Sequence, residues 1–406
     1  MANQKLGRLL PFGFISFCFC LGIGIGLFLR FGQLQRTNAA TTSTYISTST
    51  YIEDTDIENT DIDTNTVPVQ FSIPENASPD TITVQAVGDV IPGTNYPNYR
   101  LPGDRNQLIP NSVRAYLQRA DLLFGNFESS LTKYPYSSKD ISKGQIFAFR
   151  SPPSYAQLFA DVGFKVMNIA NNHAQDFGMV GFQDTVNNLK GVGIETLGHK
   201  NQILLLQVNN VPVAMIGFAP YEFYNSIHDL ETAKALVQQA KTQASIVIVS
   251  MHAGAEGTSA LRVQDKTEFF YGENRGNSIQ FARNMIDAGA DLVIGHGPHV
   301  PRALEIYNGK LIAYSLGNFL GYRTLSTAAQ TGYSMILEAK LNSNGDLVSS
   351  KIIPVHLNRQ GIPHIDQRFR TVGLLRYLIS QDFPNDQVKI NKKGEIVLAD
   401  VVAESK

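Results

Sequence analysis

Cysteine is nearly absent from this 406-residue chain, and its two cysteines, Cys18 and Cys20, lie in an apolar run near the N-terminus. Everything after Cys20 therefore lacks a thiol. This excludes disulfide bonds, zinc–thiolate sites and a cysteine nucleophile from the rest of the chain. A chain without later cysteines suits an oxidising compartment, but cysteine content alone does not locate a protein.

A large excess of charge of either sign is also missing. Lysine and arginine number 34 against 35 aspartate and glutamate residues, so the formal net charge is -1 at pH 7. A chain this balanced creates no long-range field that would concentrate nucleic acid around it. Nucleic acid is therefore not an expected partner.

Charged residues are absent from the apolar run between Leu9 and Leu29. At a helical rise of about 1.5 Å per residue, this run is long enough to cross a hydrocarbon core of roughly 30 Å. We predict that residues 1–36 form a cytoplasmic tip and a single transmembrane anchor at about 9–29 in the cell membrane, with the bulk of the chain extracytoplasmic. A cleaved signal peptide is the alternative, but its apolar core usually spans only about 7 to 15 residues.

The composition changes twice after this run. Residues 37–80 are dense in Thr, Ser, Asn and Asp and show no sustained period, which predicts a polar disordered linker. From residue 81 onward, short apolar runs end in Gly, Asn, Asp or His and alternate with stretches of helical spacing. We therefore predict one α/β domain over 81–356 and a C-terminal extension over 357–406.

Five predicted strands of this domain end in residues that can bind metal ions. Ligands of open α/β sheets collect outside the carboxyl ends of the strands, so these residues are expected to share one site. Carboxylate, amide and imidazole groups together suit divalent ions such as Mn, Zn or Fe, and a pair of such ions can activate water for hydrolysis. The five strands are predicted at Thr81–Val87, Leu122–Phe124, Lys165–Ala170, Ser245–Met251 and Leu292–Ile294.

Helices are predicted in the intervals between these strands, and further strands are predicted after them. The helices are predicted at Ser112–Ala120, Ser154–Val162, Gly181–Lys190, Leu230–Thr242 and Ser278–Ala288. Three later runs are predicted as strands of a second sheet, at Lys310–Ser315, Ser334–Leu341 and Leu347–Pro354.

The residues that follow the five strands resemble, in order, the motifs of the CapA family of capsule and poly-gamma-glutamate synthesis, a metallophosphoesterase-like (calcineurin-like) group. The likeness runs from about Ile82 to Phe319, well over half of the chain. Five motifs in order, each after a predicted strand, are far more specific than any one of them. They are Gly88-Asp89, Asn126-Phe127-Glu128, Asn171-Asn172-His173 with Asp176 and Gly178, His252-Ala253-Gly254-Ala255-Glu256, and Gly295-His296-Gly297-Pro298-His299.

The resemblance implies a fold and a set of roles. The implied fold is a metallophosphoesterase-like layered sandwich of mixed β-sheets flanked by helices. His173 would contact the substrate or protonate the leaving group, and Ile91 stands where many phosphoesterases place a metal-binding histidine. The implied metal ligands are Asp89, Glu128, Asn172, His252 and His299. The residues implied to support these ligands or contact the substrate are Asn126, Asn171, Asp176, Glu256 and His296.

Simpler interpretations of several residues stay open at this point. Asp89 could cap the turn that follows its strand, and Asp176 could cap the helix that begins near Gly178 instead of orienting His173. The segment from Tyr314 to Phe319 is as consistent with a core strand and turn as with substrate contact.

The resemblance implies a membrane-anchored, extracytoplasmic, metal-dependent phosphoesterase-like protein, with polymer-synthase subunits and an anionic polymer as partners. The alternative is a non-catalytic accessory subunit of a membrane polymer synthase. A serine hydrolase is disfavoured because the sequence contains no Gly-x-Ser-x-Gly nucleophile elbow.

Overall fold

The computed structural model describes residues 47–50, 81–386 and 388–398. The predicted cytoplasmic tip and anchor (1–36), the rest of the predicted linker and residues 399–406 lie outside these ranges. Within the described ranges, no helix combines the length and the apolar character needed to span a membrane.

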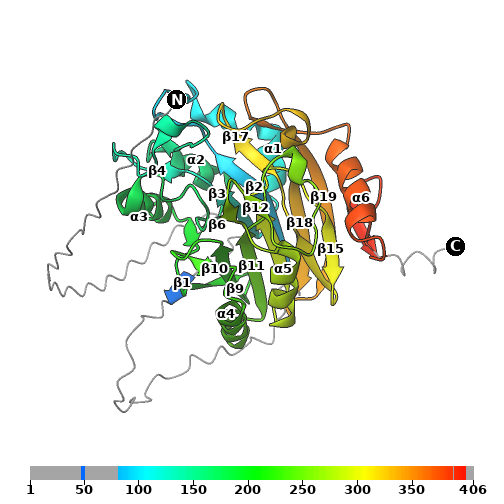
Figure 1. Ribbon diagram of the computed structural model, residues 1–406. Coiled ribbons are helices and arrows are strands. Elements are labelled where there is room, and N and C mark those ends of the chain that lie inside the picture. Colours follow the sequence, from blue (N-terminus) through cyan, green and yellow to red (C-terminus); the bar gives the residue numbers. More distant parts are fainter. Residues whose placement is uncertain (1–46, 51–80, 387, 399–406) are drawn as a thin grey trace, which may run out of the picture. The chain divides into compact units, whose positions relative to one another are not determined.

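An eight-stranded sheet forms one layer of the structure, with the order β1-β8-β9-β11-β14-β16-β15 and with β10 beside β9 (Figure 1). Strands β9, β11, β14 and β16 are parallel, so their carboxyl ends lie at the same edge. The strands are β1 (Ser47–Thr50), β8 (Ile203–Val208), β9 (Val211–Ala219), β10 (Asn225–Ser226), β11 (Ile246–His252), β14 (Leu292–His296), β15 (Leu304–Tyr307) and β16 (Lys310–Ala313).

A ten-stranded sheet forms the second layer, with the order β21-β22-β19-β18-β2-β3-β6-β7 and with β17 beside β2 and β20 beside β19. Strands β2, β3, β6 and β7 are parallel, as are β17 and β2. The strands are β2 (Thr81–Ile91), β3 (Leu122–Phe127), β6 (Val166–Asn168), β7 (Glu195–Leu197), β17 (Asn318–Gly321), β18 (Tyr333–Asn342), β19 (Leu347–Leu357), β20 (Pro363–Ile365), β21 (Val388–Ile390) and β22 (Glu395–Leu398).

Helices cover the outer faces of both sheets. Helices α1, α2 and α3 pack on the ten-stranded sheet, while α4 and α5 pack on the eight-stranded sheet (Figure 1). Helix α6 lies against β18 and β19. The helices are α1 (Asn111–Leu117), α2 (Tyr155–Val162), α3 (Gly178–Lys190), α4 (Leu230–Gln243), α5 (Ser278–Asp287) and α6 (Arg370–Asp382). All five predicted helices are present.

The alternation of side chains along β2 explains how the two sheets share a core. Ile82, Val84 and Ala86 belong to the cluster that includes the strands of the eight-stranded sheet, whereas Val87 belongs to the cluster with α1, α2 and α3, as does Val90 beyond the register shift between Val87 and Asp89. Successive residues of a strand face opposite sides, so each face of the sheet buries its own apolar set. The predicted α/β class, a layered sandwich of mixed sheets flanked by helices, is confirmed.

The predicted grouping of the three later strands in a second sheet is wrong. Strand β16 pairs with β14 in the eight-stranded sheet, whereas β18 and β19 continue the other sheet from β2. Apolar alternation identifies a strand but carries no information about its partner, because pairing depends on contacts distant in sequence.

Two regions for which no helix or strand was predicted contain such elements, and the local sequence indicates them. Strands β8 and β9 form a hairpin whose turn residues, Asn209 and Asn210, both have positive φ (49° and 65°), as tight hairpin turns require. In the predicted C-terminal extension, α6 buries Val372, Leu375 and Leu378 at helical spacing. Within the predicted linker, Ser47–Thr50 forms β1 beside β8.

The junction between β2 and β17 depends on the small size of Gly88. A Cβ atom at Gly88 would lie 1.8 Å from the carbonyl oxygen of Gly317. The same oxygen accepts a hydrogen bond from the backbone N–H of Asp89 at 3.0 Å. The absence of a side chain at position 88 therefore lets the two backbones approach where Asp89 enters the sheet edge.

We expect Gly88→Ala to lower the free energy of unfolding by about 1–3 kcal/mol, because the added methyl must displace a backbone carbonyl rather than a flexible side chain. Denaturant unfolding measures this change. The matched control is Gly373→Ala in the exposed part of α6, where a Cβ meets nothing within 4 Å. The control should raise stability by up to about 1 kcal/mol, since alanine favours helix. Equal stability of the two variants would contradict the packing argument.

Candidate metal centre

Three adjacent parallel strands place a chain of polar side chains at their carboxyl ends. Asp89 of β2 lies in register with Asn126 of β3, which lies in register with Asn168 of β6. The Asn126 amide donates to Asp89 Oδ1 at 2.8 Å, and the Asn168 amide donates to Asn126 Oδ1 at 2.9 Å. Asn171 also donates to Asn126 Oδ1, at 3.1 Å. The amides therefore fix the orientation of the Asp89 carboxylate.

Two histidines lie opposite one another at the ends of β11 and β14. His252 and His296 are in register and both are fully buried. Among the described residues, no hydrogen-bond partner exists for any of their four ring nitrogens. His296 Nδ1 lies 3.8 Å from Asp89 Oδ1, so this pair belongs to the same site as the carboxylate.

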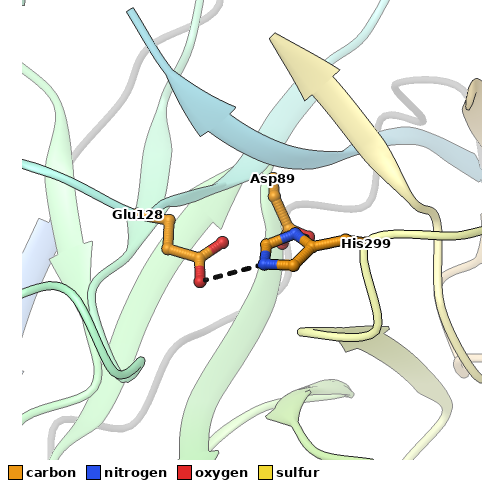
Figure 2. A group of neighbouring side chains, drawn as sticks. All are labelled: Asp89, Glu128 and His299. Carbon is orange, nitrogen blue, oxygen red and sulfur yellow. Dashed lines mark ion pairs between the residues drawn. The ribbon is translucent and has the colours of Figure 1, made fainter. Parts of the chain in front are cut away.

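His299 lies on the loop after β14 of the eight-stranded sheet and contacts polar groups of the ten-stranded sheet. Its Nδ1 lies 3.0 Å from Asp89 Oδ2 and 2.9 Å from Oδ1 of Asn318, the first residue of β17. Its Nε2 lies 3.8 Å from Glu128 Oε1 and 3.7 Å from Glu256 Oε2. Figure 2 shows Asp89, Glu128 and His299 pointing toward one another.

The chemistry of this group fits a divalent cation. Asp89, Glu128 and His299 offer ligand atoms that all lie within 4.8 Å of one another. Both carboxylate oxygens of Glu128 and the amide oxygen of Asn172 are buried and have no hydrogen-bond partner among the described residues. Burying such atoms is costly unless a partner satisfies them, and a cation would satisfy carboxylate, amide and imidazole atoms together.

The two carboxylates respond differently to their surroundings. Burial tends to raise the pKa of Asp89, but the hydrogen bond and charge of His299, with smaller effects of His296 and His252, lower it to about 2. Burial raises the pKa of Glu128 well above its usual range, and the opposing charge of His299 does not cancel this effect. Asp89 is therefore a ready anionic ligand, whereas Glu128 needs a nearby positive charge to ionise.

The pKa values of the three histidines also shift in different directions. Burial lowers the pKa of His252 well below its ordinary value and lowers the pKa of His296 to about 4, so both are neutral. Burial also disfavours charged His299, but the carboxylates of Glu128 and Asp89 raise its pKa well above the ordinary value. Neutral imidazole is the form that binds metal ions. A cation at this position would compete with the proton of His299 for the same carboxylates.

Asp176 orients His173 and does not cap α3. Its Oδ2 lies 2.9 Å from His173 Nδ1 and accepts a hydrogen bond from the backbone N–H of Phe149 at 2.6 Å. No side-chain hydrogen bond caps α3, whose N-cap residue is Phe177. Lys139 Nζ lies 2.6 Å from Asp176 Oδ1 and donates to the carbonyl of Asn172 at 2.9 Å.

The structure brings together most of the predicted residues and adds three. Glu256 lies near the centre through His299, and the backbone N–H of His173 donates to Asn171 Oδ1 at 3.0 Å. Tyr314 is buried and donates to Glu305 at 2.6 Å, as expected for a core residue. Asn318, which contacts His299, lies in the segment from Tyr314 to Phe319, for which substrate contact had stayed open as an alternative. The three residues that were not predicted are Asn168, Lys139 and Arg275, whose Nη2 lies 3.0 Å from Glu256 Oε1. Only Asn168 follows a signal visible in sequence, namely an amide at a strand end.

Comparison with known proteins gives a match over the region that contains this site. The family described as "Bacterial capsule synthesis protein PGA_cap" matches residues 83–323, more than half of the chain. The "PGA biosynthesis protein CapA" of Bacillus subtilis (strain 168) is 30% identical over 263 residues, which cover 60% of this chain and 64% of that protein. The chain therefore spans slightly less than two thirds of the length of this relative.

Two further comparisons are more distant. The "Probable polyglutamine synthesis accessory protein Rv0574c" of Mycobacterium tuberculosis (strain ATCC 25618 / H37Rv) is 25% identical over 281 residues, 61% of this chain and 69% of that protein. The solved structure of a 5'-nucleotidase precursor from Thermus thermophilus aligns with a TM-score of 0.41 at 13% identity, covering 74% of this chain and 59% of that one.

We expect the purified full-length chain to contain a divalent transition metal, and the double variant Asp89→Ala, His252→Ala to lose it. Removal of two ligands should weaken binding by more than the roughly 10- to 100-fold that loss of an outer partner costs. Elemental analysis by mass spectrometry measures the content. The control is Asp161→Ala, His228→Ala, which removes the same residue types from the exposed surface. Unchanged metal content in the first variant would refute the site.

Proposed function

Because the chain belongs to the bacterial capsule synthesis protein PGA_cap family, we propose that it is a membrane-anchored, extracytoplasmic, metal-dependent phosphoesterase-like protein of capsule or poly-gamma-glutamate synthesis. The observation that carries the proposal is the buried group of Asp89, Glu128 and His299. These residues lie among histidine nitrogens that are buried and have no hydrogen-bond partner within the described residues. Groups of this kind at the carboxyl ends of strands are typical of metal-dependent active sites.

The residues that would hold the cations are Asp89, Glu128, Asn172, His252 and His299, and the proposed number of ions is two, as Mn, Zn or Fe. When bound, such ions supply Lewis-acid activation of a phosphoryl oxygen and of the attacking water.

The chain's own contribution to proton transfer is His173. Its Nδ1 is engaged by Asp176, so Nε2 is the ring atom available to move a proton to or from a substrate. His173 also packs against the Phe149 ring, with centroids 4.6 Å apart, and its side chain is largely buried. This packing limits the rotation of the imidazole. With Nδ1–H directed at Asp176, Nε2 of the neutral imidazole would first take a proton from the attacking water and, once charged, give it to the leaving oxygen.

The location and the partners are part of the proposal. The uncharged run from Leu9 to Leu29 supports a membrane anchor, and the family supports a role in polymer synthesis. We propose that the protein acts beside polymer-synthase subunits and on or near an anionic polymer.

A non-catalytic accessory role is the second candidate, and one observation favours it. Ile91 is fully buried and apolar, and the resemblance of its motif to those of phosphoesterases implies that it stands where many of them have a metal-binding histidine. The mycobacterial relative is named an accessory protein, in agreement with this role. Such a subunit would bind a cation without turning over a phosphate ester.

We expect the metal-loaded full-length chain to hydrolyse p-nitrophenyl phosphate, and His173→Ala to lower kcat by about 10²- to 10⁴-fold while leaving metal content unchanged. Release of nitrophenolate measures turnover, and a chelator should abolish it. The control, His228→Ala, removes an exposed histidine and should retain full activity. Bound metal without any phosphoesterase turnover would favour the accessory role instead.

We expect the full-length chain to sediment with membranes and to be extracted by detergent, because the Leu9–Leu29 run would remain in the bilayer. A variant that lacks residues 1–36 should be recovered in the supernatant. Fractionation followed by immunoblotting measures the distribution. Recovery of the full-length chain in the supernatant would contradict the anchor.

A further inference from the structure

Arg275 lies beside the candidate metal centre, on the loop that precedes α5. Its backbone carbonyl accepts a hydrogen bond from the N–H of Gly254 at 2.8 Å, two residues after His252. Only 4% of Arg275 is exposed. The position of Arg275 is therefore tied to the loop that follows a proposed metal ligand.

The guanidinium of Arg275 lies against two carboxylates and two aromatic rings, but not all of its nitrogens have a hydrogen-bond partner in the part of the chain that the structure describes. Its Nη2 lies 3.0 Å from Glu256 Oε1, and its Nε lies 3.0 Å from Glu273 Oε2. The rings of Phe270 and Tyr221 lie 5.6 and 6.0 Å from the guanidinium carbon. Its Nη1 is buried and has no hydrogen-bond partner among the described residues. An unsatisfied buried donor is costly, and an anionic oxygen would remove that cost.

Glu256 connects this guanidinium to the cation site. One Glu256 oxygen faces Arg275, and the other lies 3.7 Å from His299 Nε2, which itself lies 3.8 Å from Glu128. The charge of Arg275 also acts on Glu128, where it opposes the larger effect of burial on the pKa of that carboxyl. The guanidinium of Arg275, Glu256 and His299 therefore form one series of contacts that ends at the cation site.

Arg302 is a second buried arginine, and its contacts are those of an arginine with a structural role. Arg302 is fully buried, and both of its Nη atoms donate to Glu268 at 2.8 Å. Its Nη2 also donates to the carbonyl of Ala255. Within the described residues, Nε of both arginines lacks a hydrogen-bond partner, but both terminal nitrogens of Arg302 have one, whereas Nη1 of Arg275 has none.

We propose that Arg275 is an oxyanion-binding residue of this site, which takes an oxygen of the substrate phosphoryl group at Nη1 while Glu256 and Glu273 hold the guanidinium in place. This inference rests on the proposed phosphoesterase-like function. Arginine suits the task because its planar guanidinium is always charged and presents several donors in a fixed geometry. The cations and Arg275 would then contact different oxygens of one group.

The test is calorimetric titration of inorganic phosphate into the metal-loaded full-length chain and its variants. Arg275→Met should weaken phosphate binding by about tenfold to a hundredfold, and Arg275→Lys should weaken it less. The matched control is Arg283→Met, which removes an arginine paired with Glu305 and should leave phosphate affinity unchanged. Metal content should equal that of the wild type in all variants.

Equal phosphate affinity of the wild type and folded Arg275→Met would overturn the inference, as would a metal-loaded wild type that does not bind phosphate. If Arg275→Met does not fold, Arg275→Lys decides the question in the same way. A parallel titration with glutarate, a dicarboxylate, distinguishes a carboxylate from a phosphoryl group as the oxyanion that Arg275 binds. Tighter binding of glutarate than of phosphate would overturn the phosphoryl assignment. A wild type that holds no metal would instead contradict the proposed function, and phosphate titration of the metal-free chain would still test Arg275.

Discussion

The burial of two carboxylates, Asp89 and Glu128, where the edges of two sheets meet is the constraint on which the site depends. Charged groups removed from water need compensation from paired charge, hydrogen bonds or metal ions. Asp89 receives an amide hydrogen bond from Asn126 and lies beside His299, whereas neither oxygen of Glu128 has a hydrogen-bond partner among the described residues. Burial keeps Glu128 protonated without a nearby cation, and ionised Glu128 together with Asp89 would exceed the charge that His299 neutralises, so a bound cation is the partner that would compensate both carboxylates.

The fold supplies this pocket through rigid elements. Parallel strands from both sheets bring their carboxyl ends to one edge, so Asp89, Asn126, His252 and His296 occupy positions fixed by strand register. Loops contribute the remaining groups, Glu128, Asn172, Glu256 and His299. The division is physically sensible, because backbone hydrogen bonds fix the ligands near the sheets while loops can adapt around a substrate.

Much of this arrangement could be predicted from the sequence, since apolar runs that end in polar residues indicate strands whose ends share an edge. Glu128 was identified as a ligand because its Asn-x-Glu motif, which follows such a run, resembles a motif of the CapA family. The sequence did not reveal Lys139 beside Asp176 or Arg275 beside Glu256, because these contacts depend on loop conformations and on pairs distant in sequence. Nor did it reveal that β16 and β18 belong to different sheets, since strand partners are chosen by tertiary packing.

Two other omissions had local signals that were available. Asn209 and Asn210 between two apolar runs favour a hairpin turn, and the spacing of Val372, Leu375 and Leu378 favours a helix. Helix α6 lies against β18 and β19, so these residues extend the core of the domain beyond its predicted end.

The close approach of Gly88 to Gly317 also restricts which residues fit at these two positions. The carbonyl of Gly317 fills the space that a side chain at position 88 would need, and Gly317 itself has a φ of 72°, which favours glycine. A larger residue at position 88 is accommodated only if the backbone at position 317 retreats. The two positions are far apart in the chain, yet the room for a side chain at position 88 is set by the backbone conformation at position 317.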